Sequence, residues 1–180
     1  MQPVTPSLAY DRTTVVLHWL TAALVVTQWV GAQVIDLFPS DALRVDARSI
    51  HIVLGAFLAA LLAFRIWWRT TRGRRLPPAD RGALNVLAKV THRGLYVLLV
   101  SMVIVGLSLA WARGDSLFGI VRITTFPAGH RVLADRLQEI HAALGWAILA
   151  LAGAHAAAAL THRYVMRDHV LARMRPTVRR

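Results

Sequence analysis

Long apolar segments separated by charged loops are the main pattern along this chain of 180 residues. An α-helix rises 1.5 Å per residue, so about 20 apolar residues cross the roughly 30 Å hydrocarbon core of a bilayer. Segments of that length occupy residues 14–35, 49–68, 94–112 and 141–161. The pattern predicts an all-α fold, an integral membrane four-helix bundle that forms one transmembrane domain over residues 1–180.

The first and fourth apolar segments have informative beginnings. The first carries His18 and Trp19 and continues to Ile35, whereas a secretory signal has a shorter apolar core and a small-residue cleavage site, so we expect a retained helix. Residues 131–139 repeat with helical spacing and place their charges on one face, which indicates that the fourth helix begins before its apolar part.

Composition and charge agree with a membrane protein. The chain is 56% hydrophobic and 17% charged, with a mean hydropathy of +0.49. Its net charge of +12 would suggest nucleic-acid binding in a soluble protein, but the charges are unevenly distributed. Residues 1–13, 65–93 and 162–180 hold 15 Lys+Arg and three acids, whereas residues 36–48 and 113–139 hold six Arg and six acids. The positive-inside rule therefore places both termini in the cytoplasm, which for a bacterial protein means the inner membrane.

The chain contains no cysteine, which excludes several kinds of redox centre. Disulfides, iron–sulfur clusters and haem attached through a Cys-x-x-Cys-His motif all require thiols. Any haem is therefore expected to be of the non-covalent b type.

Four histidines lie near the ends of the apolar segments: His18, His51, His141 and His155. Histidine at membrane depth usually serves a ligand, a proton or an ion path. With both termini inside, His51 and His141 lie at the outer depth, and His18 and His155 at the inner depth. His155 follows His141 by 14 residues, about 21 Å along the helix and within about 40° of the same face. The spacing predicts two haem b groups, each with its iron between two imidazoles.

Small residues near these histidines allow two interpretations. Gly55 and Gly145 follow His51 and His141 by four residues and so share their helix faces, where a missing side chain would leave room for a macrocycle. Small residues also mark ordinary helix packing in membranes, so the glycines alone do not decide between the two.

These residues resemble the bacterial cytochrome b561 family of four-helix, di-haem membrane cytochromes, related to the b subunits of hydrogenases and formate dehydrogenases. The resemblance rests on the His18-Trp19 pair, on His51-x-x-x-Gly55, on the Arg65/Arg69 basic exit and on the spacing from His141 to His155. The ending GAHAAAALTHRYVMRDHVLARMRP is similar to that of small stand-alone members that act as superoxide oxidases. That resemblance implies electron transfer from superoxide to ubiquinone.

Three further residues could belong to a cofactor or quinone site, or could be polar residues at the membrane interface. The resemblance associates His162, seven residues after His155, with a quinone site beside the inner haem; an interfacial polar residue at a helix end is the other interpretation. Arg65 suits a haem propionate, because a guanidinium binds carboxylates bidentately, but snorkelling at a positive inner face explains it as well. His92 is interpreted as interfacial, because the third helix offers it no matched partner.

The leading hypothesis is a haem oxidoreductase that oxidises superoxide on the periplasmic side and reduces ubiquinone in the membrane. Six arginines of the outer loops could attract the superoxide anion, although six acids accompany them: Arg44, Arg48, Arg113, Arg122, Arg131 and Arg136. One alternative is a cytochrome b anchor subunit that passes electrons between a periplasmic dehydrogenase or hydrogenase and quinone. A second alternative is a haem-free membrane scaffold or transporter.

Overall fold

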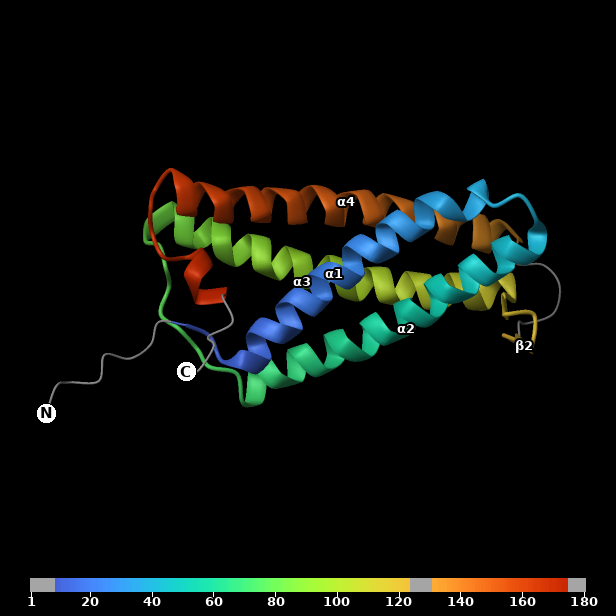
Figure 1. Cartoon of the computed structure of the whole chain (residues 1–180), viewed down its shortest axis with the longest axis horizontal. Coiled ribbons are helices and arrows are strands. Elements are labelled where there is room, and N and C mark those ends of the chain that lie inside the picture. Colours follow the sequence, from blue (N-terminus) through green and yellow to red (C-terminus); the bar gives the residue numbers. More distant parts are fainter. Residues whose placement is uncertain (1–8, 124–130, 175–180) are drawn as a thin grey trace, which may run out of the picture.

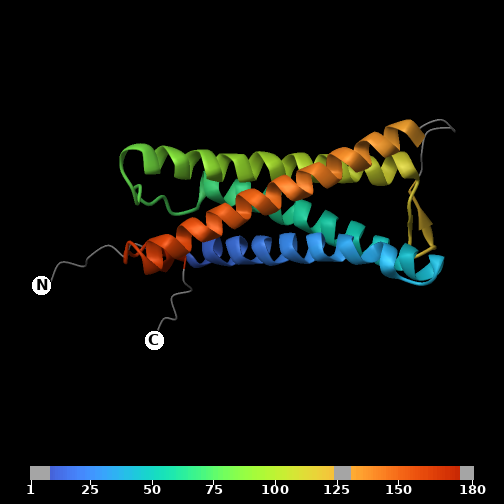
Figure 2. The same cartoon turned by 90° about the horizontal axis from the view of Figure 1, so that it is seen from above.

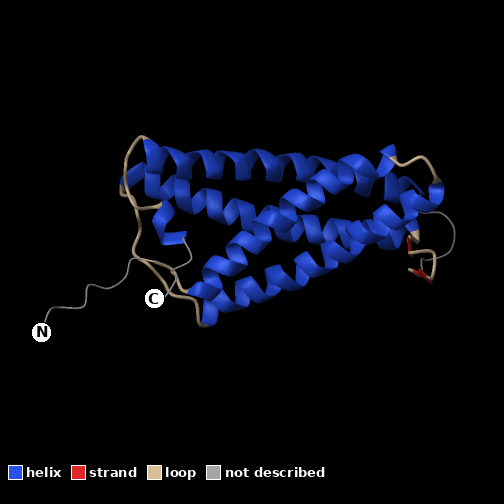
Figure 3. Ribbon diagram, viewed as in Figure 1, coloured by secondary structure: helices blue, strands red, loops and turns tan. Residues whose placement is uncertain are grey.

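A computed structural model describes residues 9–123 and 131–174 of the chain. Its elements, in chain order, are α1 (Arg12–Val34), the 3-10 turn η1 (Ile35–Leu37), α2 (Asp41–Thr71), α3 (Gly82–Arg113), β1 (Ser116–Leu117), β2 (Val121–Arg122), α4 (Arg131–Tyr164) and η2 (Leu171–Met174). Helix dominates the described chain, and the only described strands form a short antiparallel hairpin at one end of the molecule (Figure 3).

The four helices run along the long axis of the molecule, and α1 and α4 cross their neighbours obliquely (Figures 1 and 2). We call the end that holds residues 9–12, 71–82 and 164–174 the terminal end, and the end that holds residues 35–41 and 114–123 the hairpin end. Helix α4 packs mainly on α3, and α1 mainly on α2. The described ends of the chain meet, because the amide of Tyr10 donates to the carbonyl of Arg173 at 3.0 Å.

All four long helices have the length and composition of membrane spans. Few of their residues are buried inside the molecule, and large apolar side chains such as Val97 and Ile104 point outward. A small internal cluster of Leu62, Leu99 and Ile148 joins α2, α3 and α4. An apolar exterior around a small core is the arrangement that a lipid solvent requires, and it confirms the predicted membrane bundle of helices.

The helices are longer than the apolar segments from which they were predicted. Helix α2 begins at Asp41 rather than at residue 49, because the Ser40 side chain caps it by accepting from the Leu43 amide. Helix α3 ends at the left-handed Gly114, whose φ is 64°. Helix α4 begins at Arg131, as the helical spacing of residues 131–139 indicated. Hydropathy marks the lipid-facing part of a helix, whereas caps fix where it starts and stops.

Ser49 attaches the hairpin to α2. This side chain is fully buried, and its Oγ lies 2.7 Å from the carbonyl of Val45 and 3.1 Å from that of Ser116. The same oxygen accepts from the amide of Phe118 at 2.8 Å. Phe118 has a positive φ of 52°, which a non-glycine residue rarely adopts. One hydroxyl therefore holds a strained turn against the start of α2.

Asp11 organises the terminal end. Its carboxylate caps α1 by accepting from the Thr14 amide and hydroxyl at 2.9 and 2.7 Å. It also accepts from Trp68 Nε1 at 3.0 Å and from the Arg74 amide at 3.0 Å. Partial burial alone would raise the pKa of Asp11, but these hydrogen bonds lower it to about 2. The start of α1 is thereby fixed to the end of α2.

Candidate functional site

Two histidine pairs lie inside the bundle, one toward each end. Near the hairpin end, the rings of His51 on α2 and His141 on α4 have their centroids 6.2 Å apart, with the planes at 73°. Nearer the terminal end, His18 on α1 and His155 on α4 are also 6.2 Å apart, with the planes at 74°. The structure thus brings together the partners that the depth argument predicted. Helix α4 supplies one ring to each pair.

The spacing within each pair suits one metal ion between two imidazoles. A metal–imidazole bond is about 2.0 Å long, and the ring centre lies roughly 1.1 Å beyond the nitrogen, so the two centres should be about 6.2 Å apart. Both pairs have that separation. The residues of each pair therefore fit one metal ion, such as a haem iron, that both imidazoles would hold.

The rest of the surroundings agree with that fit. Among the described residues, no three His, Asp or Glu side chains group as a metal site built from protein ligands alone would require. Nδ1 of His51 and Nδ1 of His141 are buried and make no hydrogen bond within the described protein. A buried imidazole nitrogen normally has a hydrogen-bond partner, so each ring of this pair has one unsatisfied polar atom within the described protein.

Gly106 on α3 packs against the hairpin-end pair. A β-carbon at this position would lie 2.9 Å from Cε1 of His141, so a side chain there would displace the ring. Gly55 and Gly145, which the sequence suggested as space for a macrocycle, have other neighbours. A β-carbon at Gly55 would meet Nε2 of Gln28 at 3.2 Å, and one at Gly145 would meet Cε of Met102 at 3.6 Å. The described contacts of these two glycines are therefore those of helix packing.

Gln28 is a further polar residue of the hairpin-end site that sequence reasoning did not single out. Its Nε2 on α1 donates to the backbone carbonyl of His51 at 2.9 Å. This bond links α1 to the turn of α2 that carries His51.

His92 and Arg65 surround the terminal-end pair. The His92 ring on α3 lies 5.1 Å from that of His155, closer than His18 does, so α3 does bring a residue to this site. The guanidinium of Arg65 on α2 lies 3.2 Å from Nδ1 of His18 and stacks over the Tyr96 ring at 5.3 Å. His92 was predicted to be interfacial and unmatched; its contact with His155 was not foreseen, because hydropathy does not reveal how α3 rotates against α4.

His162 lies between two carboxylates at the terminal end. Its Nδ1 is 2.6 Å from Oδ2 of Asp168, and its Nε2 is 3.7 Å from Oδ2 of Asp80. Although burial works in the opposite direction, hydrogen bonds from His162 and from the Val170 amide hold the pKa of Asp168 below its ordinary value. Asp80 belongs to the connection between α2 and α3, so the ring joins three separate segments. Neither aspartate was identified from the sequence.

The arginines predicted to form an anion entrance are partly paired with acids at the hairpin end. Arg44 contacts Asp41 at 3.2 Å, Arg48 contacts Asp115 at 3.6 Å, and Arg136 contacts Glu139 at 3.0 Å. Burial raises the pKa of Asp115, while Arg48 and Arg113 oppose that shift. The Asp115 side chain is only 10% exposed, so Arg48 presents its charge beside a sheltered carboxyl group.

Comparison with known proteins agrees with the geometry. A family model described as prokaryotic cytochrome b561 matches residues 9–177. The chain is similar to a probable superoxide oxidase CybB of Yersinia pestis, with 30% identity over 91% of this chain and 93% of the relative. It is also similar to cytochrome b561 homolog 2 of Escherichia coli, with 28% identity over 92% of this chain and 90% of the relative. A cytochrome b562 of Cereibacter sphaeroides is 28% identical over 95% of this chain and 98% of the relative.

The match runs through all four helices and includes both histidine pairs. Together with the membrane-spanning bundle, it shows that the chain belongs to the prokaryotic cytochrome b561 family of membrane electron-transfer proteins, whose members bind haem b.

Proposed function

We propose that this protein oxidises superoxide at the hairpin end, reduces ubiquinone near the terminal end, and binds two b haems between those sites. The two histidine pairs carry the proposal, because they lie at different depths with the separation that one metal ion requires. His51 and His141 would hold one haem, and His18 and His155 the other. When bound, the haems supply reversible one-electron chemistry at both depths.

The orientation follows from charge. The terminal end carries most of the excess Lys+Arg, so it faces the cytoplasm, and the hairpin end faces the periplasm. Two superoxide anions each lose one electron and become dioxygen, and ubiquinone takes up two electrons and two protons to become ubiquinol. Two haems at different depths serve this reaction when the donor and acceptor sites lie at different ends of the bundle.

At the periplasmic side, Arg48 and Arg113 would attract the anion. Both guanidinium charges lower the pKa of Asp115, against the effect of its burial, because both arginines lie close to this carboxyl group between α2 and the hairpin. Arg44 and Arg136 are each paired with one acid, whereas Arg48 and Arg113 share Asp115, so this local pair keeps excess positive charge and is the best candidate for guiding the anion.

At the cytoplasmic side, His162 would bind the quinone and pass on its proton. Nδ1 of His162 donates to the Asp168 carboxylate, which fixes the orientation of the ring. Nε2 is then the nitrogen that would exchange a proton with the quinone. Asp80 faces that nitrogen at 3.7 Å and can take part in the same transfer.

Arg65 would bind a haem propionate. A histidine that binds iron through Nε2 carries its proton on Nδ1, so Arg65 could not then donate to His18 and would turn to another acceptor. A carboxylate suits the guanidinium geometry.

The first test concerns the haems. A pyridine haemochrome assay should find about two protohaems per chain, as two bis-imidazole pairs would bind. Replacing His51 or His141 should remove one haem signal, and replacing His18 or His155 the other. His92→Gln is the control, because this ring lies beside the inner pair but is not assigned to iron. One haem or none in the unaltered protein would contradict the assignment. Loss of the same haem signal in the His51 and His155 variants would contradict it as well.

The second test concerns the reaction. A superoxide source should reduce the oxidised protein faster than dismutation removes superoxide, and added ubiquinone should reoxidise it. His162→Gln should slow only the quinone step, with both haem spectra unchanged, whereas His169→Gln, an exposed neighbour, should have no effect. Haems that do not react with superoxide would favour the anchor-subunit alternative. An unchanged quinone rate in His162→Gln would return this residue to an interfacial structural role.

A further inference from the structure

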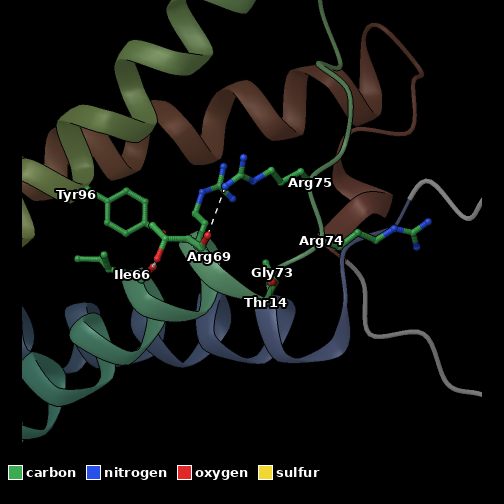
Figure 4. A pocket seen from close by; sticks show the side chains of 8 residues that line it. Thr14, Ile66, Arg69, Gly73, Arg74, Arg75 and Tyr96 are labelled. Atoms are coloured by element: carbon green, nitrogen blue, oxygen red, sulfur yellow. Dashed lines mark hydrogen bonds between the residues drawn. The ribbon is translucent and has the colours of Figure 1, made fainter.

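An arginine-rich pocket of about 470 Å³ opens at the terminal end, between α1, α2 and α3 (Figure 4). The polar part of its lining consists of Arg69, Arg74, Arg75, Thr14, Thr70 and Tyr96. The pocket is separate from the histidine pairs in composition, because no lining residue comes from α4. Arg65 does not line it either; its guanidinium stacks on Tyr96 and contacts His18.

The lining carries positive charge and includes no acidic residue. Asp11 is a carboxylate hydrogen-bonded to two of the lining residues. It already accepts hydrogen bonds from Thr14, Trp68 and the Arg74 amide. Within residues 9–123 and 131–174, neither Arg69 nor Arg75 forms an ion pair; Arg75 reaches only the carbonyl of Thr70, at 3.5 Å. Guanidinium donors around one cavity suit the oxygens of a phosphate-type anion.

The position of the pocket argues for a lipid as the source of that anion. It lies at the end of a membrane-spanning helix, where Trp67 and Trp68 form an aromatic belt. One wall is the apolar side chain of Ile66, which is 38% exposed, and the neighbouring Trp67 is 46% exposed. A free phosphate ion gains nothing from an apolar wall, whereas the acyl chains of a lipid would run along it. Basic pockets between helices at the cytoplasmic face are a recurring way of binding anionic headgroups.

We propose that this pocket binds the phosphodiester headgroup of an anionic membrane phospholipid. Arg69 and Arg75 would bind the phosphate oxygens, and the acyl chains would lie against Ile66 and Trp67. The site does not depend on the proposed superoxide reaction, because none of its residues is assigned to haem, superoxide or quinone.

The test is a titration of the haem-loaded full chain in neutral detergent with short-chain phosphatidylglycerol, phosphatidylcholine and inorganic phosphate. Native mass spectrometry counts bound lipid, and thermal shift follows all three ligands. Phosphatidylglycerol should bind and raise the melting temperature. The double variant Arg69→Gln and Arg75→Gln should bind it roughly a hundredfold more weakly, since the loss of each charged hydrogen bond weakens binding about tenfold.

Arg81→Gln is the matched control, because Arg81 lies on the same loop but does not line the pocket; it should bind lipid like the unaltered chain. An equal loss in Arg81→Gln would mean that only overall charge matters and would overturn the proposal. It would also be overturned if inorganic phosphate stabilised the protein as well as the lipid did, or if phosphatidylcholine bound equally well. A change in the haem spectra of the double variant without weaker lipid binding would assign the arginines to propionate instead. Unaltered haem spectra show that the variants are folded.

Discussion

At the scale of single residues, the absence of a side chain at Gly106 leaves room for the His141 ring. A β-carbon there would approach Cε1 of His141 to 2.9 Å, a separation that real β-carbons essentially never show. The imidazole is held by the helix that carries it, so relief would come from rotating or shifting the ring. Gly153, on α4, has nothing within 4 Å of the same hypothetical atom and so provides a matched comparison.

We therefore expect Gly106→Ala to disturb the His51–His141 pair. Overpacking of this kind costs about 1–3 kcal/mol, and ring displacement should lower the haem content by up to about one group per chain or shift the low-spin EPR signal. Gly153→Ala should retain both signals. Identical spectra for the two variants would show that the ring has more freedom than the contact indicates.

Asp11 gives a second prediction at this scale, and it concerns pH. Its pKa is lowered from 3.8 to about 2, so its stabilising effect is complete above about pH 4 and is lost as the pH falls toward 2. Asp11→Ala should lower the free energy of unfolding by about 1–2 kcal/mol at pH 7, as the loss of a helix cap does. Asp11→Asn keeps one acceptor but has no charge to titrate, so its stability should vary less between pH 4 and 2. Thermal unfolding in detergent measures both effects; equal pH profiles for the unaltered chain and Asp11→Asn would contradict the assignment.

At the scale of elements, the apolar segments predicted the four helices but not their ends. Hydropathy contains no information on the Ser40 cap that starts α2, nor on the start of α3 at Gly82. The hairpin β1–β2 was not predicted, because strands of two residues have no detectable period and depend on the distant Ser49. Tertiary contacts decide such elements.

Replacing Ser49 should therefore release the hairpin. Ser49→Ala leaves the buried Phe118 amide without its acceptor, a loss of about 1–3 kcal/mol, in a turn whose positive φ already carries strain. Hydrogen exchange of residues 114–123 should become faster, while exchange in mid-α3 stays slow. Ser101→Ala, within α3, is the control. Unchanged exchange in the hairpin of Ser49→Ala would show that other contacts hold it.

At the scale of the whole molecule, the sequence predicted which histidines meet, because depth along two membrane helices is set by residue counting. It did not predict what surrounds them. His92 beside His155, Asp80 and Asp168 around His162, and Gly106 against His141 all depend on helix rotation or on loop paths. A symmetric apolar helix in lipid shows no preferred face in its sequence, so rotation becomes visible only in the packed bundle.

The proposed orientation makes a prediction for the whole molecule, and the cysteine-free sequence makes it easy to test. Leu37, 77% exposed at the hairpin end, should react as cysteine with a membrane-impermeant maleimide in intact spheroplasts. Ala79, exposed in the connection between α2 and α3, should react as cysteine only after lysis. The reverse labelling pattern would invert the topology and the proposed direction of electron transfer.

Both histidine pairs take one ring from α4, the last long helix of the chain. During synthesis, neither pair can therefore form before α4 has been made. While α1, α2 and α3 leave the ribosome and enter the membrane, they carry His18, His51 and His92, but neither pair exists. Both pairs become complete only when α4 inserts. Under the proposed assignment of one haem to each pair, a nascent chain would acquire its pigments at one late stage, and a chain arrested before α4 would remain colourless.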